Sequence, residues 1–203
     1  ADESDDGLER SYLFCGHSRG GAVTNLLASY ADGASDEYDA IASANDVRAY
    51  TFATPNCTSS DDARNDAYSN IFNIVNPSDL IPQLPLSSWG YSRYGRDVVL
   101  PVDDSDAYEM NVNEMRDAYE RTMGTEYPDV SGNEDAVVRF VSEIGDEFDS
   151  FDELVSPAGV AKVVPLIIQS DIPKLLVSHY PNTYIAWLEA TNASDLVQLS
   201  DVI

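Results

Sequence analysis

Short apolar stretches and one longer periodic stretch alternate in the first third of the chain and predict a strand–helix–strand order. Strands are predicted over 8–15, 47–54 and 71–76, since Ser11–Cys15 is aromatic and aliphatic and 71–76 is apolar and β-branched, which is typical of buried strands. Apolar residues return every three or four positions over 19–30, which predicts a helix, and a short helix is expected over 61–68. This order favours a mostly parallel sheet with flanking helices, so the predicted fold class is α/β.

The second half of the chain is predicted to be mainly helical. Residues 77–104 are rich in proline, glycine and aromatic side chains and are interpreted as an ordered loop. The apolar stretch 160–177 is expected to form helices broken at Pro165 and Pro173. A last helix is predicted over 181–190, with a proline near its start.

Two more helices are predicted between these segments from apolar residues at helical spacing. The first face consists of Tyr108, Val112, Met115, Tyr119 and Met123. The second, after a cap at Ser131 or Asn133, consists of Val137, Val141, Ile144, Phe148 and Phe151. We therefore expect a helical, lid-like insertion over 105–177 within a single partial domain that covers 1–203.

Composition narrows the possible partners. The chain has 36 acidic and 11 basic residues and a net charge of −25, which disfavours nucleic acid, anionic membranes and anionic substrates. A neutral ester or amide fits better, and no stretch is long and apolar enough to predict a membrane span. The acidity is interpreted as a solubilising surface, with a saline habitat or Ca²⁺ binding left open. No acidic calcium-binding loop pattern is present, so we predict no metal site and no cofactor.

The most informative motif is the sequence Gly16-His17-Ser18-Arg19-Gly20 between the first strand and the first helix. This is the pattern of a nucleophile elbow, a sharp turn that exposes the hydroxyl of Ser18. Glycine is expected to be required at positions 16 and 20, because a Cβ at either position would clash in the turn. The backbone N–H of Arg19 is expected to stabilise an oxyanion. The alternative is a glycine-rich turn without chemistry. The helix that follows has one apolar face, formed by Ala22, Val23, Leu26, Leu27 and Tyr30.

A nucleophilic serine requires a base and a carboxylate that orients the base. The chain has two histidines. The side chain of His17 is expected to leave the elbow on another side of the turn, so the predicted base is His179. The acid is expected in a loop at the carboxyl end of a strand, after the serine and before the histidine. Asp79 meets both conditions, and Asp97 and Asp103 are the competing candidates.

The two cysteines do not form a disulfide framework. Cys15 lies in the strand before the elbow and is expected to be a small buried apolar residue. Whether it pairs with Cys57 is left open.

The chain resembles the lipase class 3 family, in its bacterial branch. The resemblance rests on segments 16–22, 49–56, 70–85, 89–95 and 179–188. It implies the fold of an α/β-hydrolase, a triad of Ser18, Asp79 and His179, and the hydrolysis of carboxylic esters, mainly acylglycerols. One departure is Arg19, where many of these lipases have leucine.

A larger departure is that several strands usually precede the elbow, and one of their loops supplies the second oxyanion N–H. We therefore expect the chain to represent the C-terminal half of such a domain, completed by an N-terminal half or a companion chain. Trp89, Tyr91 and Tyr94, together with the helices, are expected either to wall the acyl pocket or simply to pack.

Two alternatives to a lipid esterase remain. One is a non-catalytic α/β-hydrolase-like module for binding or assembly, and the other is a peptidase or thioesterase. The family resemblance and the acidic, lysine-poor composition favour an extracellular or cell-surface location, with the cytoplasm left open.

Overall fold

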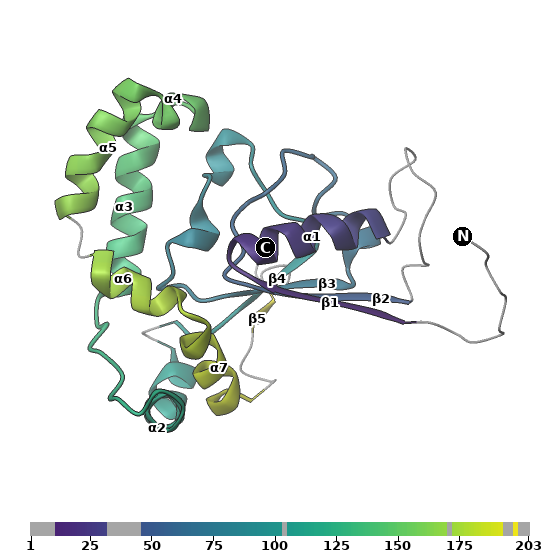
Figure 1. The fold of residues 1–203 in the computed structure, drawn as a ribbon, viewed down its shortest axis with the longest axis vertical. Helices are drawn as coiled ribbons and strands as arrows, with labels where there is room; N and C mark the ends of the chain where they lie inside the picture. The colour runs from purple at the N-terminus through teal and green to yellow at the C-terminus, as the bar shows by residue number, and fades with distance from the viewer. Residues whose placement is uncertain (1–10, 32–45, 103–104, 170–171, 193–196, 199–203) are drawn as a thin grey trace, which may run out of the picture.

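The computed structural model describes residues 11–31, 46–102, 105–169, 172–192 and 197–198. Its centre is a sheet with the strand order β1-β2-β3-β4-β5 (Figure 1). The strands are β1 (Tyr12–His17), β2 (Val47–Phe52), β3 (Ile71–Val75), β4 (Arg96–Val99) and β5 (Val197–Gln198). The first four run parallel and β5 is antiparallel to β4. The carboxyl ends of the parallel strands therefore share one edge of the sheet, where α/β proteins place their functional loops.

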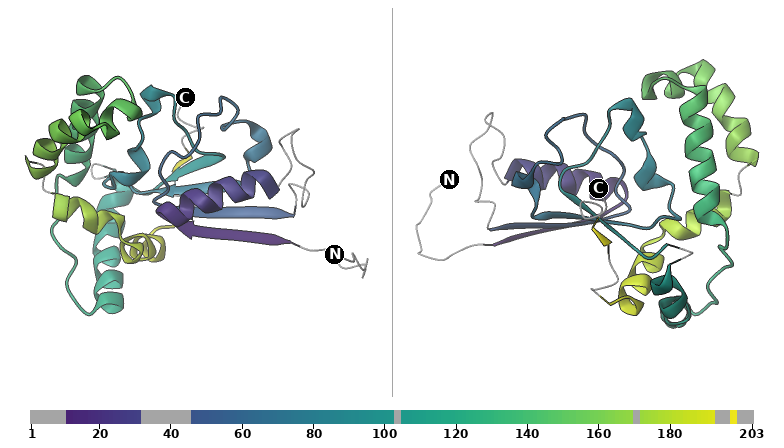
Figure 2. Two further views of the ribbon diagram at one scale, coloured as in Figure 1. Left: turned by 45° about the horizontal axis from the view of Figure 1, so that its top comes forward. Right: turned by 180° about the vertical axis from the view of Figure 1, so that it is seen from behind.

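Helices pack on both faces of the sheet, on one of them only near the carboxyl ends of the strands. Helix α1 (Arg19–Ala31) lies on one face, and α2 (Asp106–Met123) and α7 (Pro181–Ala190) lie side by side near the carboxyl ends of the strands (Figures 1 and 2). The alternation along β3 separates the two cores, since successive side chains point to opposite faces. Ile71 packs under α1, whereas Ile74 belongs to the cluster with α2 and α7.

The other helices form a lobe beside the sheet (Figure 2). They are α3 (Asn133–Glu147), α4 (Phe151–Val155), α5 (Pro157–Gln169) and α6 (Ile172–His179). Three short 3-10 turns complete the connections: η1 (Asp66–Tyr68), η2 (Ile81–Gln83) and η3 (Ser87–Trp89). Within the described ranges, none of the helices has the length and apolar character that a membrane crossing requires.

The pattern-based prediction finds most elements but misses two strands. Residues 77–104 were expected to be loop, yet they contain β4, which is only four residues long. Strand β5 was not expected, because two residues carry no periodic signal and are strand only through pairing with β4. The predicted short helix over 61–68 is reduced to a turn followed by η1.

Two predicted helix boundaries are also wrong. Helix α5 runs through Pro165, because the neighbouring Val163 and Leu166 still pack on the apolar cluster of α3. The residue that caps α3 is neither Ser131 nor Asn133 but Gly132, which adopts a left-handed conformation at φ 77°.

The expected apolar face of α1 does not face the sheet. Val23 and Leu27 are 53% and 51% exposed, and Tyr30 is exposed too. The buried side of the helix is polar or small, because the Asn25 side chain bonds to the Asn73 side chain and to the backbone of Tyr94. Hydrogen bonds to the sheet therefore set the rotation of α1, and its apolar residues are left outward.

Cys15 is also exposed rather than buried as predicted. It points to the same face of β1 as Leu13, which is 71% exposed, and the described helices leave this part of the sheet uncovered. On the neighbouring strand Tyr50 is likewise exposed, stacked on Phe72. The described part of the chain therefore has an uncovered apolar surface around β1.

Candidate active site

Ser18 occupies the turn between β1 and α1 with a positive φ of 58°. This is an uncommon conformation for a residue with a side chain, and the surrounding hydrogen bonds maintain it. The Ser18 N–H donates to the carbonyl of Phe52 at 2.8 Å, and the Ser18 carbonyl accepts from the N–H of Ala22 at 3.0 Å. The sequence therefore folds locally into the strained elbow that the motif predicts.

The two elbow glycines differ in their surroundings. A Cβ on Gly16 would lie 2.5 Å from the carbonyl oxygen of Gly20 and would also strike the hydroxyl of Thr24, as expected. A Cβ on Gly20 would meet nothing within 4 Å among the described residues, so the predicted clash there is wrong. The second crowded position is Gly21, where a Cβ would lie 3.2 Å from the carbonyl oxygen of Phe52. The first turn of α1 presents Gly21, and not Gly20, to the end of β2.

The structure brings Ser18, His179 and Asp79 into one hydrogen-bonded chain. His179 ends α6, and its Nε2 lies 2.8 Å from the Ser18 Oγ. Its Nδ1 lies 2.9 Å from Oδ2 and 3.1 Å from Oδ1 of Asp79, which follows β3. Because the carboxylate only accepts, Nδ1 carries the proton and Nε2 is left to accept from the serine hydroxyl.

The Asp79 carboxylate is fully buried and has two further donors. The N–H of Ile81 donates to Oδ1 at 2.9 Å, and the hydroxyl of Tyr184 donates to Oδ2 at 2.8 Å. The backbone N–H of Asp79 is bonded to the carbonyl of Asn76. A desolvated carboxylate with this many donors is held in one orientation. The sequence interpretation missed Tyr184, although it lies in a segment that carries the family resemblance.

Asp97, the competing acid, is engaged elsewhere. It forms ion pairs with Arg93 at 2.6 Å and with Arg64 at 2.9 Å. Burial alone raises the pKa of Asp97, but the charges and hydrogen bonds of Arg93 and Arg64 outweigh it and lower the pKa to about 2. Arg93 also donates to the carbonyls of Thr54 and Pro82, so this cluster holds the loops behind the site. The other competitor, Asp103, lies outside the described residues.

His17 precedes Ser18 at the end of β1, and its ring lies beside the ring of His179. Its Nε2 is 2.8 Å from the backbone carbonyl of His179, and because a carbonyl only accepts, this nitrogen carries a proton. Burial is the main cause of the lowered pKa of His17, so the ring is neutral with its proton on Nε2. The side chain therefore ties the elbow to the end of α6.

Arg19 occupies the first position of α1, and its side chain is exposed. The amides of a first helical turn have no acceptor within the helix, which leaves the Arg19 N–H available beside Ser18. We assign no second oxyanion donor among the described residues.

Both cysteines are free thiols. The Cys57 thiol donates to the Oδ1 of Asn25 at 3.4 Å, and burial is the main cause that raises the pKa of Cys57 to about 11. This thiol is therefore a packed and unreactive group.

A cavity of about 670 Å³ lies behind the loop that carries Asp79. Pro77, Pro82, Arg93 and Leu100 are among its lining residues, whereas the three residues of the hydrogen-bonded chain are not. It is therefore separate from the nucleophile.

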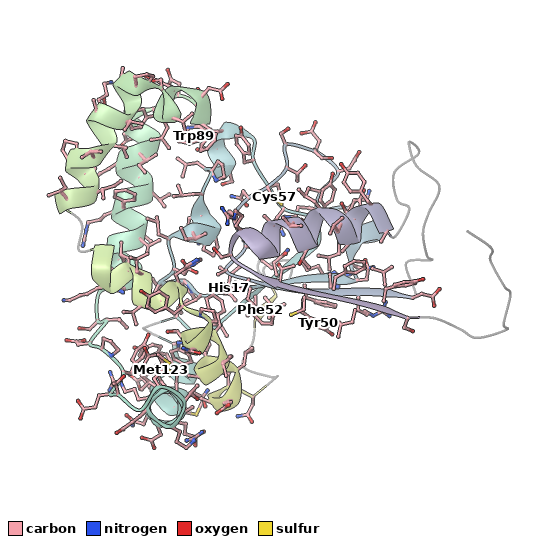
Figure 3. The ribbon with its side chains drawn as sticks, viewed as in Figure 1. His17, Tyr50, Phe52, Cys57, Trp89 and Met123 are labelled. Atoms are coloured by element: carbon pink, nitrogen blue, oxygen red, sulfur yellow. The ribbon has the colours of Figure 1, made fainter. Side chains whose placement is uncertain are left out.

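The aromatic residues expected at an acyl pocket make packing contacts. The Trp89 indole donates to the carbonyl of Phe148 at 3.0 Å (Figure 3 shows Trp89 beside the helical lobe). The rings of Tyr91 and Phe151 are in edge contact, and Tyr94 packs on Tyr68 under α1.

The region that contains the elbow matches a known protein family. Residues 5–89 match the family Lipase (class 3). The predicted resemblance to class 3 lipases is therefore confirmed for this part of the chain, which includes Ser18 and Asp79, whereas His179 lies beyond it. The parallel sheet, the elbow and the flanking helices form part of the α/β-hydrolase fold of these lipases, as predicted.

Two solved lipase structures are similar over part of the chain. The lipase of Rhizopus microsporus var. chinensis is 20% identical with a TM-score of 0.36, covering 47% of this chain and 33% of that one. The triacylglyceride lipase of Rhizomucor miehei is 25% identical with a TM-score of 0.35, covering 44% and 33%. The matched region thus spans about a third of each lipase. No curated protein matches the chain.

Proposed function

We propose that this protein is a serine hydrolase of carboxylic esters, with acylglycerols or related neutral lipid esters as substrates. The observation that carries the proposal is the unbroken hydrogen-bonded chain from the Ser18 Oγ through the His179 ring to the buried Asp79 carboxylate. Its serine lies in a strained elbow, and residues 5–89 match class 3 lipases.

The proposed reaction is a two-step acyl transfer. The Ser18 Oγ attacks the ester carbonyl carbon while its proton moves to Nε2 of His179, and Asp79 stabilises the imidazolium that forms. The Arg19 N–H donates to the oxyanion of the tetrahedral intermediate. Collapse of the intermediate breaks the ester C–O bond, and Nε2 returns the proton to the leaving alkoxide. Water, deprotonated by the same nitrogen, then releases the acid and restores the serine.

Charge supports a neutral substrate. A chain with a net charge of −25 repels anions, whereas an uncharged ester meets no such barrier.

The reaction needs no metal or cofactor, because the nucleophile, the base and the orienting acid are all side chains. A peptidase or thioesterase would use the same groups, and a non-catalytic module would not need them in hydrogen-bonding order. An extracellular or cell-surface location stays a prediction.

The decisive experiment is active-site labelling. A fluorophosphonate is expected to modify Ser18, and Ser18→Ala is expected to lose both the label and p-nitrophenyl butyrate hydrolysis. Ser131→Ala, which changes an exposed serine in the turn before α3, is the matched control and should keep both. A panel of ester, thioester and amide substrates separates the esterase from its alternatives. Wild-type protein that is folded and paired with its N-terminal half or companion chain, but neither labels nor hydrolyses any of them, would exclude the proposed function.

We also propose that an N-terminal half or companion chain completes the sheet at β1. Within the described residues β1 pairs only with β2, Leu13 on this strand is exposed, and so are Val23 and Leu27 on the neighbouring α1. An apolar strand with a free edge adds further strands readily, and the added backbone would lie near the oxyanion site.

Hydrogen exchange tests this second proposal. The outward amides of β1 are expected to become protected, and activity to rise, when the completing polypeptide is present. A chain that reaches full activity alone, with those amides still exchanging fast, would contradict it.

A further inference from the structure

Tyr184 lies outside the proposed triad and donates a hydrogen bond to its carboxylate. It lies in the first turns of α7, five residues after His179, and is 1% exposed. Its hydroxyl is 2.8 Å from Oδ2 of Asp79, on the oxygen that Nδ1 of His179 approaches most closely. Residue 184 thus reaches across 105 positions of sequence to the loop after β3.

The direction of this hydrogen bond is determined by its neighbours. The N–H of Asn76 donates to the Tyr184 oxygen at 3.2 Å, so the single hydroxyl proton is directed to Asp79. Burial, followed by the Asp79 charge, raises the pKa of Tyr184 well above its ordinary value. The group is therefore a protonated donor at neutral pH.

The ring of Tyr184 is held from two sides. It makes edge contacts with the rings of His17 and Phe52, with centroids 5.9 Å and 6.4 Å away. It also belongs to the apolar cluster of α2 and α7, together with Tyr119 and Trp187. A hydroxyl at the end of a ring packed in this way has little freedom to move, which suits it to hold another group in place.

We propose that Tyr184 is a positioning residue, whose hydroxyl orients the Asp79 carboxylate toward Nδ1 of His179 and shares its negative charge. The proposal deepens the proposed function and rests on it for its kinetic part. Without the hydroxyl, one lone pair of a fully buried carboxylate loses its partner. The carboxylate then rotates more freely, and its Oδ2 accepts more strongly from Nδ1 of His179.

Tyr184→Phe removes the hydroxyl and keeps the ring. The kcat for p-nitrophenyl butyrate is expected to fall by about tenfold with KM nearly unchanged, because a charge-assisted hydrogen bond is lost and no substrate contact is altered. Tyr119→Phe is the matched control, since it removes a hydroxyl from a buried tyrosine of the same cluster. It should leave kcat as in the wild type.

A spectroscopic measurement makes the test independent of activity. The NMR resonance of the His179 Nδ1 proton is expected to move downfield in Tyr184→Phe, because Asp79 accepts more strongly from the imidazole. It should move upfield when 3-fluorotyrosine, whose hydroxyl is a stronger donor, replaces Tyr184 within an intact fold. The Tyr119→Phe protein should show neither change.

The outcomes separate the two proposals. A wild-type protein that shows neither hydrolysis nor labelling when paired with its N-terminal half or companion chain overturns the proposed function, while the Nδ1 resonance still decides the role of Tyr184. An unchanged resonance in both Tyr184 variants overturns the positioning role. So does an equal loss of kcat in Tyr119→Phe and Tyr184→Phe, which would indicate packing alone.

Discussion

The Nε2–H of His17 donates to the backbone carbonyl of His179 at 2.8 Å, so the residue before the proposed nucleophile holds the residue proposed as its base. The two rings are also tilted against each other with centroids 4.9 Å apart. The elbow and the end of α6 are 162 positions apart in sequence and are joined directly by this bond. The spacing between the Ser18 Oγ and the imidazole therefore depends on His17.

His17→Phe tests this link. The variant keeps a ring but loses the Nε2–H donor, so the part-buried carbonyl of His179 loses this hydrogen bond. We expect the protein to lose about 1 kcal/mol of stability and kcat to fall several-fold. Urea unfolding and ester hydrolysis measure the two effects. Wild-type values in both would show that the bond does not position His179.

The elbow glycines predict opposite results for the same substitution. Gly16→Ala is expected to disrupt the elbow and abolish fluorophosphonate labelling, because the new Cβ would strike the Gly20 carbonyl and Thr24. Gly20→Ala is expected to label normally and to gain up to about 1 kcal/mol, since alanine is the better helix former. Labelling together with thermal melting checks both. A labelled, stable Gly16→Ala protein would contradict the described turn.

Asp97 predicts an acid-dependent loss of stability. Its pKa is lowered from 3.8 to about 2 in the folded protein, so its contribution is complete above about pH 4 and is lost as the pH falls toward 2. Asp97→Asn is expected to cost about 3 kcal/mol at pH 7, because it leaves the buried Arg93 without its carboxylate. The cost should shrink between pH 4 and pH 2. Denaturant unfolding of both proteins over this pH range measures the cost. A stability difference that does not change with pH would contradict the lowered pKa of Asp97.

The rotation of α1 predicts which of its side chains matter. Asn25→Ala is expected to destabilise the protein by about 2 kcal/mol, since it removes the bonds to Asn73 and to the backbone of Tyr94. Val23→Ala, on the exposed side of the same helix, should change stability by less than about 0.5 kcal/mol when no companion chain is bound. Chemical unfolding of both variants makes the comparison. A larger loss of stability in Val23→Ala than in Asn25→Ala would contradict the described rotation of α1.

Sequence patterns predicted the elements whose signals are long or sterically strict. The helix spacing over α2 and α3 is such a signal, with Met115 and Ile144 both buried as expected. The four-residue β4 and the two-residue β5 carry no comparable pattern, so only their pairing partners define them. The hydrophobic pattern of α1 misled because the helix faces the sheet with the Asn25 amide and with small residues such as Ala28, and not with its larger apolar side chains.

The sequence by itself determined the elbow, because its geometry depends on neighbouring residues and on the small size of Gly16. It also singled out Asp79 and His179 as partners for Ser18, since chain order and the small number of histidines left few choices. Only the tertiary structure decided that the three groups meet, that Asp97 is held by arginines, and that Tyr184 reaches the buried carboxylate. These contacts join positions far apart in the chain, and their existence depends on how the sheet and helices pack, which no local pattern encodes.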